Sequence, residues 1–443
     1  MPEPHVLILG GGFAGFTLAR QLRHDAAAQR LRVTVVEPEQ YLTYKPLLPE
    51  VAGGETAPRD TLVPLAGRFP HAQLMAGAVE TVDTSAKVAV VRLLDRTVRS
   101  VGFDQVVFAL GAVSKTLPIP GLSEHAIGFS SLEEAVYLRD HIVDRVRFAA
   151  ATQDPAERQR ALTFVFVGGG YTGVEAIAEL HRRAKIELGR YPALARERMS
   201  WLLVEEGGRI AAELPPKLSQ WTLQLLRRRG ITVLLHTKLT SCEDGIAHLD
   251  NGDAHPCDTL VWAAGVTPNP VLDRADVPRG AKGHVQCNAR LQAVRNDGSP
   301  IEGVWALGDN AQIPDLTAEK QPAFCPPNAQ NAVRQAKVLA ANIRRTTRGA
   351  ETIEYRHRSL GTLASYSGHQ GAAVVRTLPL HGAAAWAVDK VYHAVALPSA
   401  GRRLRLVLGW IANGLAPRDT ASTSAVRDPR ARFVRAAARQ NDN

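Results

Sequence analysis

Two copies of one glycine pattern constrain the fold of this 443-residue chain more than any other feature. Each copy reads Gly-x-Gly-x-x-Gly, follows a short apolar run and precedes a helix-like segment, and the copies begin at Gly10 and Gly168. In this strand–turn–helix setting the first glycine makes a tight turn, the second lets the backbone approach a pyrophosphate, and the third lets helix and strand touch. The free amides at the start of the helix then hold the phosphates. The sequence therefore predicts two dinucleotide-binding folds in one chain.

In the first copy, a short strand at residues 5–9 leads into the turn, and a helix-like segment covers residues 16–23. A second strand, residues 32–36, ends at Glu37, the position where an acid binds ribose hydroxyls in such folds. The residues of this turn that we expect at the cofactor are Gly10, Gly12, Phe13, Ala14 and Gly15.

In the second copy, a strand at residues 162–167 precedes the turn and a helix at residues 174–188 follows it. The next strand, residues 201–204, ends at Glu205 and is followed by Glu206. The strand end favours Glu205 as the ribose ligand, and Glu206 is the alternative. A carboxylate at this position repels a 2′-phosphate, so we expect NADH rather than NADPH. The glycines expected at this cofactor are Gly168, Gly170 and Gly173.

Three further apolar runs end at residues suited to line such sites. They end at Gly111, Gly265 and Asp309, and they cover residues 103–111, 259–265 and 303–309. Ligands of open parallel sheets bind outside the carboxyl ends of the strands. Because hydride transfer requires two stacked rings, two sites in one chain indicate a tightly held flavin and an exchangeable nicotinamide.

These residues resemble a known family, the two-dinucleotide flavoprotein reductases, and within it the chain looks most like the type II NADH:quinone oxidoreductases. The resemblance covers nearly the whole chain, from Val6 to about Leu415. Its more specific segments are residues 44–54, 167–175, 261–266 and 329–335.

The resemblance implies roles for particular residues. It implies that FAD contacts Gly10, Gly12, Gly15, Glu37, Lys45 and Asp309, and that NADH contacts Gly168, Gly170, Gly173 and Glu205. It also implies that Glu175 lies where nicotinamide, flavin and quinone meet, which makes Glu175 our candidate for handling the protons of a quinone. The alternative is that Glu175 only stabilises the first turn of its helix.

One motif departs from the family pattern, which reads Ala-Gln-x-Ala-x-Gln with both glutamines near the quinone. In this chain Gln330 matches, the second position is Arg334, and Gln335 follows one step later. One step along a helix rotates a side chain by about 100°, so Gln335 does not replace the missing glutamine. We take Gln330 and Arg334 as the candidate acceptor-site residues, and Arg334 leaves an acceptor other than a quinone open.

Cysteine and histidine patterns argue against other chemistry. The disulfide reductases of this superfamily carry a cysteine pair in the stretch that corresponds to residues 41–49, where this chain has none. The four cysteines form no Cys-x-x-Cys motif and the 14 histidines show no metal-ligand spacing, so we expect no metal site. No basic strand interleaved with aromatic residues is present, so we expect no nucleic-acid partner.

The C-terminal region is basic and has two apolar stripes. Residues 400–443 hold nine Arg and three Asp, which is +6 of the chain's net +10. Apolar residues recur at helical spacing in two groups, Leu404, Val407, Leu408, Ile411 and Leu415, and Ala384, Val388, Val391, Tyr392 and Val395. In the second group Asp389, Lys390 and His393 lie opposite the stripe.

Basic amphipathic helices with tryptophan lie in membrane interfaces. The alternative is that the stripes pack on the protein's own domains or on a second copy. Because quinones reside in the bilayer, the family resemblance favours peripheral membrane association. Residues 418–443 lack periodicity and are expected to be mobile.

We therefore predict an α/β protein with two doubly wound domains, the second inserted in the first. The predicted domains are residues 1–113 with 291–347 for FAD, 114–290 for NADH, and a membrane-facing C-terminal domain at 348–443. The predicted function is FAD-dependent oxidation of NADH with two-electron reduction of a membrane quinone, without proton pumping, by a homodimer on the cytoplasmic membrane face. No signal peptide and no spanning helix are expected.

Two alternative functions remain open at this point. One is a soluble NADH-dependent flavoprotein reductase that passes electrons to a protein or another small acceptor. The other, from a different class, is a flavoprotein whose redox state controls the binding of a partner.

Overall fold

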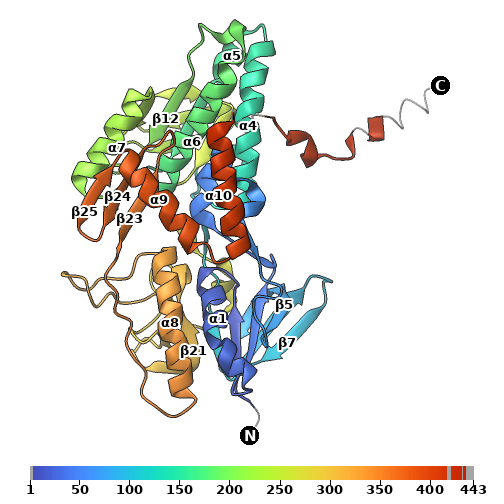
Figure 1. Cartoon of the computed structure of the whole chain (residues 1–443), viewed down its shortest axis with the longest axis vertical. Helices are drawn as coiled ribbons and strands as arrows, with labels where there is room; N and C mark the ends of the chain where they lie inside the picture. The colour runs from blue at the N-terminus through green and yellow to red at the C-terminus, as the bar shows by residue number, and fades with distance from the viewer. Residues whose placement is uncertain (1–2, 417–420, 432, 436–443) are drawn as a thin grey trace. The chain divides into compact units, whose positions relative to one another are not determined.

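The computed structural model describes residues 3–416, 421–431 and 433–435, which form two compact units (Figure 1). Unit 1 comprises Met1–Thr43, Leu62–Lys115 and Val266–Leu360, and unit 2 comprises Tyr44–Thr61, Thr116–Gly265 and Gly361–Asn443. Each unit contains a sheet whose central strands are parallel, so the predicted α/β class is confirmed. The two units are compact parts of the structure, whereas the predicted domains were divided by the cofactor that each would bind. The two divisions therefore differ, and the predicted domain boundaries stay a prediction.

The sheet of unit 1 has the strand order β20-β21-β8-β1-β2-β5-β6-β7. β1 (His5–Leu9) is buried along its whole length, as a continuous apolar run in a covered parallel sheet requires. The order reverses at β1, because β2 pairs with one side of it and β8 with the other. The first glycine turn starts at this reversal, which is where ligands bind in doubly wound sheets. The strands that run parallel to β1 are β2 (Arg32–Glu37), β5 (Gln73–Asp83), β8 (Gln105–Phe108) and β21 (Pro300–Ala306).

Helices α1 (Phe13–Ala27) and α8 (Ala329–Thr346) of unit 1 pack against each other. Antiparallel strands extend the sheet at both edges, and unit 1 also contains short two-stranded sheets. These strands are β6 (Val88–Leu93), β7 (Val98–Gly102), β20 (Gln292–Val294), β3 (Tyr41–Thr43), β4 (Leu62–Pro64), β9 (Ala112–Ser114), β18 (Val266–Pro268), β19 (Val285–Gln286) and β22 (Ala311–Gln312).

The five-stranded sheet of unit 2 is parallel throughout, in the order β10-β17-β11-β12-β13. Its order reverses at β11 (Thr163–Val167), which has β12 on one side and β17 on the other, and the second glycine turn starts there. The other strands are β10 (Ala126–Gly128), β12 (Ser200–Val204), β13 (Ile231–Leu234) and β17 (Thr259–Trp262).

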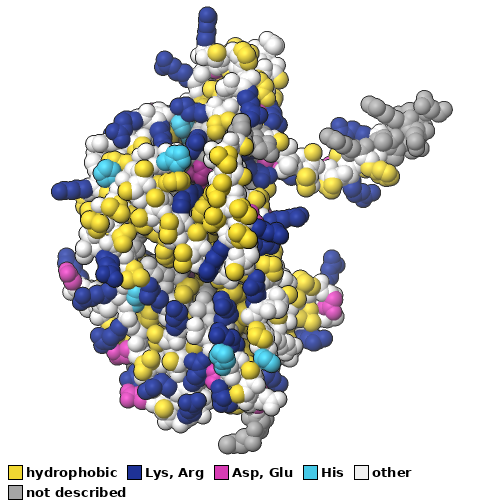
Figure 2. All heavy atoms as spheres, in the orientation of Figure 1, with side chains coloured by type: hydrophobic (Ala, Val, Ile, Leu, Met, Phe, Trp, Pro, Cys, Tyr) yellow, Lys and Arg dark blue, Asp and Glu magenta, His cyan; other side chains and the backbone are white. Residues whose placement is uncertain are grey.

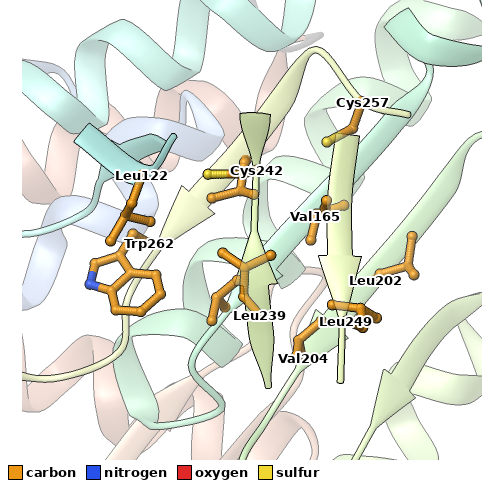
Figure 3. Close-up of a cluster of buried hydrophobic side chains, with 12 residues drawn as sticks. Leu122, Val165, Leu202, Val204, Leu239, Cys242, Leu249, Cys257 and Trp262 are labelled. Atoms are coloured by element: carbon orange, nitrogen blue, oxygen red, sulfur yellow. The ribbon is translucent and has the colours of Figure 1, made fainter. Parts of the chain in front are cut away.

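An antiparallel sheet of β14 (Leu239–Ser241), β15 (Ile246–Leu249) and β16 (Ala254–Pro256) adds a layer to unit 2. Leu239 of this sheet, and Cys242 and Cys257 directly after β14 and β16, join buried side chains of the parallel strands in one apolar cluster (Figure 3). The helices of unit 2 are α2 (Leu48–Gly53), α3 (Leu122–His125), α4 (Leu132–Ala151), α5 (Pro155–Ala161), α6 (Tyr171–Leu188) and α7 (Pro216–Arg228). Of these, α2 packs on both α4 and α6.

Unit 2 ends in a three-stranded sheet and two helices, α9 (Ala383–Ala396) and α10 (Ala400–Leu415). The strands are β23 (Gly361–Ser365), β24 (Gly371–Val375) and β25 (Leu378–His381), and α9 packs on all three. Both predicted amphipathic segments are helices, but they are turned with their apolar stripes outward. The exposed stripe residues include Val391, Tyr392, Val395, Leu404, Leu408, Ile411 and Leu415.

This exposure shows that the alternative of stripes packed on the protein's own domains is wrong for these residues. Asp389, Lys390 and His393 of α9 are the buried ones. Hydrophobic side chains gather on the face where Figure 1 shows α9 and α10, with Lys and Arg among them (Figure 2). No helix within the described ranges has the length and apolar content needed to cross a bilayer.

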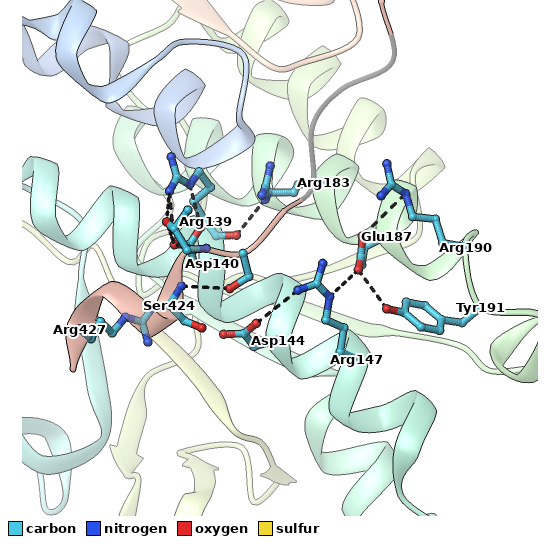
Figure 4. Close-up of polar contacts among 12 residues, drawn as sticks. Arg139, Asp140, Asp144, Arg147, Arg183, Glu187, Arg190, Tyr191, Ser424 and Arg427 are labelled. Atoms are coloured by element: carbon cyan, nitrogen blue, oxygen red, sulfur yellow. Dashed lines mark hydrogen bonds and ion pairs between the residues drawn. The ribbon is translucent and has the colours of Figure 1, made fainter. Parts of the chain in front are cut away.

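Part of the C-terminal tail is attached to α4. Thr423 Oγ1 donates a hydrogen bond to Asp140 Oδ2 (2.6 Å), and the Arg427 guanidinium lies 3.9 Å from the centre of the Tyr137 ring. Figure 4 shows Ser424 and Arg427 beside Asp140 in this region. The mobility of the tail stays a prediction, and residues 417–420, 432 and 436–443 lie outside the described residues.

Candidate functional site

The first glycine turn has a geometry that requires glycine at two positions. Gly10 has a φ of +104°, which L side chains rarely adopt. A Cβ on Gly15 would lie 1.8 Å from the carbonyl oxygen of Gly10, so α1 contacts the end of β1 directly. A Cβ on Gly12, in contrast, would meet no described atom within 4 Å, and no described side chain caps α1. The turn therefore leaves open space beside the helix start, as a phosphate needs.

The second turn repeats this geometry in unit 2. Gly168 has a φ of +109°, and a Cβ on Gly173 would lie 2.0 Å from the carbonyl oxygen of Gly168. At Gly170 the nearest atom to a Cβ would be Glu213 Oε1 at 3.8 Å, and again no described side chain caps the helix. The two turns thus offer the same kind of cradle, which fits the phosphates of one dinucleotide each.

Each cradle has a carboxylate held against it. Gly11 N donates to Glu37 Oε2 (2.6 Å) in unit 1, and Gly169 N donates to Glu205 Oε2 (2.5 Å) in unit 2. Burial raises the pKa of Glu37, partly offset by its backbone hydrogen bonds. Glu206 is exposed and its Oε1 lies 3.0 Å from Lys238 Nζ. This geometry supports Glu205 rather than Glu206 as the ribose-binding acid.

The other predicted glycines also fit a nearby ligand. Gly111 and Gly265 have φ values of +68° and +94°, and a Cβ at either position would meet no described atom within 4 Å. Asp309 lies in a short turn with Asn310, whose Oδ1 accepts from Gly111 N (3.0 Å). Sequence reasoning missed Asn310. Its side chain is fully buried and joins the loop that carries Asp309 to the loop that contains Gly111.

Helix α8 places the three polar side chains of the altered motif differently. Gln335 is buried and its Oε1 accepts from Gly308 N (2.8 Å), so it fixes the loop that carries Asp309. Gln330 Oε1 lies 2.9 Å from His357 Nε2 and accepts from Leu360 N (3.1 Å). Arg334 is half-buried, and we find no hydrogen bond or ion pair from it to any described residue. Gln335 therefore has a structural role that the sequence reasoning missed, although its place on the apolar stripe of α8 was a signal for it.

Glu175 is the fifth residue of α6 and lies beyond the first turn, which holds no acid, so the alternative that Glu175 only stabilises that turn is wrong. Its Oε1 accepts from Ser365 N (2.9 Å) on β23. Its pKa is raised well above the ordinary value, first by burial and then by the charge of Asp389, with Glu50 and Glu213 adding to the effect. A carboxyl in this environment keeps its proton at a higher pH than an exposed one. The protonated form of such a group is the form that donates a proton.

The buried face of α9 contacts α2 through charged groups. Lys390 Nζ lies 2.6 Å from Glu50 Oε1 and 3.3 Å from Glu55 Oε2. Trp410 of α10 donates from Nε1 to Glu50 Oε2 (2.9 Å), and Lys390 Nζ lies 4.7 Å from the centre of that indole ring. These contacts join both C-terminal helices to α2 and to Glu55 after it through polar groups, and the apolar stripes of the two helices stay exposed.

The remaining predicted residues are positioned as follows. Ala14 is buried and Phe13 half-buried at the start of α1, whereas Lys45 is exposed on a short helical turn of unit 2. The four cysteines are free, and burial raises the pKa of Cys257 and of Cys325 to about 11. Thiols that stay protonated at neutral pH are poor nucleophiles, in agreement with the absence of a dithiol motif.

The two parallel sheets, each with a glycine turn and a carboxylate at its point of reversal, define a protein with two dinucleotide-binding folds. The chain belongs to the pyridine nucleotide-disulphide oxidoreductase family, whose model matches residues 4–336. The prediction of an oxidoreductase is therefore confirmed.

Several known proteins are similar to this chain over almost its whole length. The chain is 27% identical to demethylphylloquinone reductase NdbB of Synechocystis sp., over 93% of this chain and 97% of that protein. It is 25% identical to type II NADH:quinone oxidoreductase NdhA of Mycobacterium tuberculosis, over 91% and 86%. Its fold is similar to that of NDH2 from Plasmodium falciparum in complex with NADH, with a TM-score of 0.85 at 18% identity, over 95% of this chain and 100% of that one. The resemblance to type II NADH:quinone oxidoreductases is confirmed.

Proposed function

We propose that the chain holds FAD in the cradle of unit 1, binds NADH in the cradle of unit 2, and catalyses oxidation of NADH with two-electron reduction of a quinone. The observation that supports this proposal most is the matched pair of glycine turns. In each turn a carboxylate accepts a hydrogen bond from the backbone N–H of the residue after the first glycine, Gly11 or Gly169. The named relatives that act on quinones support the choice of acceptor. When bound, the flavin supplies a centre that takes hydride from a nicotinamide and gives electrons to an acceptor.

The binding roles follow from the two cradles. The amides beside Gly12 and Gly170 hold pyrophosphates, and Glu37 and Glu205 accept hydrogen bonds from ribose hydroxyls. Glu205 also repels a 2′-phosphate, which makes NADH the preferred donor. The further contacts that we assign to FAD are Phe13, Ala14, Lys45, Gly111 and Asp309, and Gly265 is assigned to NADH.

Three residues are assigned to the acceptor, Glu175 in unit 2 and Gln330 and Arg334 in unit 1. The raised pKa of Glu175 favours its protonated form, so we assign it the role of proton donor to the quinone. Gln330 has its carboxamide oriented by His357 and Leu360, and its amide group is available to a carbonyl oxygen. Arg334 adds a cation that a quinone accepting electrons would attract.

We also propose that the protein associates peripherally with the cytoplasmic face of a membrane through α9 and α10. The outward apolar stripes and the arginines of α10 support this association. A second copy of the chain is the alternative to a membrane as the surface that covers the apolar stripes. A homodimer that covers only part of the stripes would still leave the rest for a membrane.

The test is an assay of the purified protein. We expect a yellow protein that releases about one FAD per chain, because unit 1 contains one glycine turn for FAD. NADH oxidation is then measured against soluble quinones, small electron-carrier proteins and oxygen. Fast turnover with quinones supports the proposal, whereas turnover with a protein acceptor alone indicates the soluble reductase. Slow turnover with every acceptor, together with redox-dependent capture of one partner, indicates the partner-binding flavoprotein.

A further inference from the structure

The inner face of α9 carries a hydrogen-bonded chain of titratable groups that the proposed function has not used. His393 Nδ1 lies 2.9 Å from the hydroxyl of Tyr44, and His393 Nε2 lies 3.2 Å from Asp389 Oδ1. Tyr44, Asp389 and His393 are 2%, 3% and 9% exposed. Burying three polar side chains has a free-energy cost unless they are bonded, and amphipathic helices ordinarily turn such residues to water.

We propose that His393 and Asp389 form a proton relay that resupplies Glu175 during quinone reduction, with Tyr44 as the residue that positions the imidazole. The inference rests on the proposed function. Reduction of a quinone to a quinol takes up two electrons and two protons, whereas oxidation of NADH to NAD⁺ releases two electrons and one proton. One further proton per turnover must therefore come from water.

The relay ends at Glu175 because of how three elements of unit 2 pack. Glu175 of α6 is bonded to Ser365 at the end of β23, and α9 packs on β23. Asp389 is buried on α9, and its charge is the second cause, after burial, of the raised pKa of Glu175. A carboxylate that has just given up its proton is therefore next to the negative end of the relay, which favours its reprotonation.

The hydrogen bonds permit a proton to move in this direction. His393 protonated on both nitrogens donates from Nδ1 to the hydroxyl of Tyr44 and from Nε2 to Asp389. Nε2 passes its proton through Asp389 to Glu175 and then takes one from water, so one proton moves from water to Glu175 per turnover. Nδ1 keeps its hydrogen throughout, and the Tyr44 hydroxyl holds the ring in place in both states.

The other charged groups around the relay come from α2, α6, α9 and α10, and from the residues after α2 and before α7. Glu50 and Glu55, on and after α2, face Lys390 of α9, which they neutralise. Glu179 of α6 is buried near Lys390 and Glu50, and its pKa is raised to about 7. Two groups face Tyr44 besides Asp389, namely Tyr392 of α9 and Arg403 of α10. Glu213, which precedes α7, adds to the negative charge near Glu175. The cation of Lys390 is therefore engaged elsewhere, and His393 is left as the basic group bonded to Asp389.

The experiment compares an acceptor that takes protons with one that does not. His393→Gln keeps hydrogen-bonding capacity but has no titratable ring, and Tyr44→Phe removes only the positioning hydroxyl. Their matched controls in the same unit are His381→Gln, at an exposed side chain, and Tyr191→Phe, at a half-buried side chain whose hydroxyl donates to Glu187. The full-length protein is assayed with NADH and either a soluble quinone or ferricyanide, from pH 6 to pH 9, and each variant's flavin content and melting temperature are recorded.

We expect the ratio of quinone to ferricyanide turnover to fall at least about tenfold in His393→Gln, since positioned proton transfer contributes about 10²–10⁴-fold. Tyr44→Phe should lower the ratio less, and the controls should keep it. The quinone turnover of His393→Gln should also decline more steeply as pH rises, because Glu175 then depends on protons taken directly from water.

Two results would overturn the relay without touching the proposed function. These are an unchanged ratio in His393→Gln, or an equal fall of both activities in Tyr44→Phe and His393→Gln with the same pH profile as the wild type. If His393→Gln does not fold, the ratio and pH profile of Tyr44→Phe decide the question. A wild-type protein that reduces ferricyanide but no quinone would instead contradict the proposed function.

Discussion

Alanine at two neighbouring glycines of the second turn should separate ligand binding from folding. At Gly173, a Cβ would lie 2.0 Å from the Gly168 carbonyl oxygen, about 1.4 Å short of ordinary contact at 3.4 Å. Helix α6 would have to move away from β11, and overpacking of this kind costs about 1–3 kcal/mol. At Gly170 the φ of −69° suits alanine, and the nearest atom to a Cβ would be 3.8 Å away.

Gly170→Ala should therefore change the free energy of unfolding by no more than about 1 kcal/mol, since capping and chain-entropy effects oppose each other. The new methyl group nevertheless occupies the space assigned to the pyrophosphate. We expect the KM for NADH to rise at least tenfold, equivalent to about 1.4 kcal/mol of lost binding. Flavin content should stay at the wild-type level, because the cradle of unit 1 is untouched.

The assay combines thermal unfolding with NADH titration of steady-state turnover at a fixed quinone concentration. Gly173→Ala is the packing control and should lower the melting temperature, whereas Gly170→Ala should not. A Gly170→Ala protein with wild-type KM would refute the assignment of this turn to NADH. Loss of flavin from the same variant would show that the two cradles have been assigned to the wrong cofactors.

Four further outcomes are expected. Glu205→Gln should narrow the preference for NADH over NADPH, measured as the ratio of kcat/KM values, while Glu206→Gln at the exposed neighbour should not; a wild type that prefers NADPH would contradict the assignment. Burial raises the pKa of Glu179 to about 7, so the folded state keeps a proton that the unfolded state loses near pH 4.5, and this site's contribution to stability falls as pH rises between these values. Glu179→Gln should therefore gain melting temperature relative to the wild type as pH rises from 5 to 8, and a constant difference would argue against the raised pKa. Leu408→Glu on α10 should weaken binding to anionic vesicles in a sedimentation assay, whereas Leu94→Glu, at an equally exposed site of unit 1, should not; equal binding by both would refute the membrane surface. Arg334→Gln should change the KM for quinone and leave the KM for NADH unaltered, and no change in either would remove Arg334 from the acceptor site.

The sequence was sufficient to predict the two cradles, for a physical reason. A phosphate-binding turn depends on local features, namely an apolar strand, three glycines at fixed spacing and an acid at the end of the next strand. The structure has Gly10 and Gly168 in the left-handed region and Glu37 and Glu205 bonded to the turns. Each of these features lies within one strand–turn–helix unit and the strand after it.

The sequence was not sufficient where long-range packing decides the outcome. Periodicity identified α9 and α10 as amphipathic, but it could not tell which face the body of the protein covers. The buried Glu50 offers an ion pair to Lys390 and a hydrogen-bond acceptor to Trp410, and both partners are more than 300 residues away in the chain. Asn310, Gln335 and the Thr423 contact with α4 have the same character, because each depends on a partner that sequence spacing does not reveal.

The most direct test of the account is an anaerobic titration of the purified protein, followed by its visible absorption. The account predicts a yellow protein whose colour is bleached by an equimolar amount of NADH and restored when a soluble quinone is added. A protein without flavin colour, or one whose colour NADH does not bleach, would contradict the assignment of the two cradles. A bleached protein that quinone fails to reoxidise would contradict the quinone as acceptor.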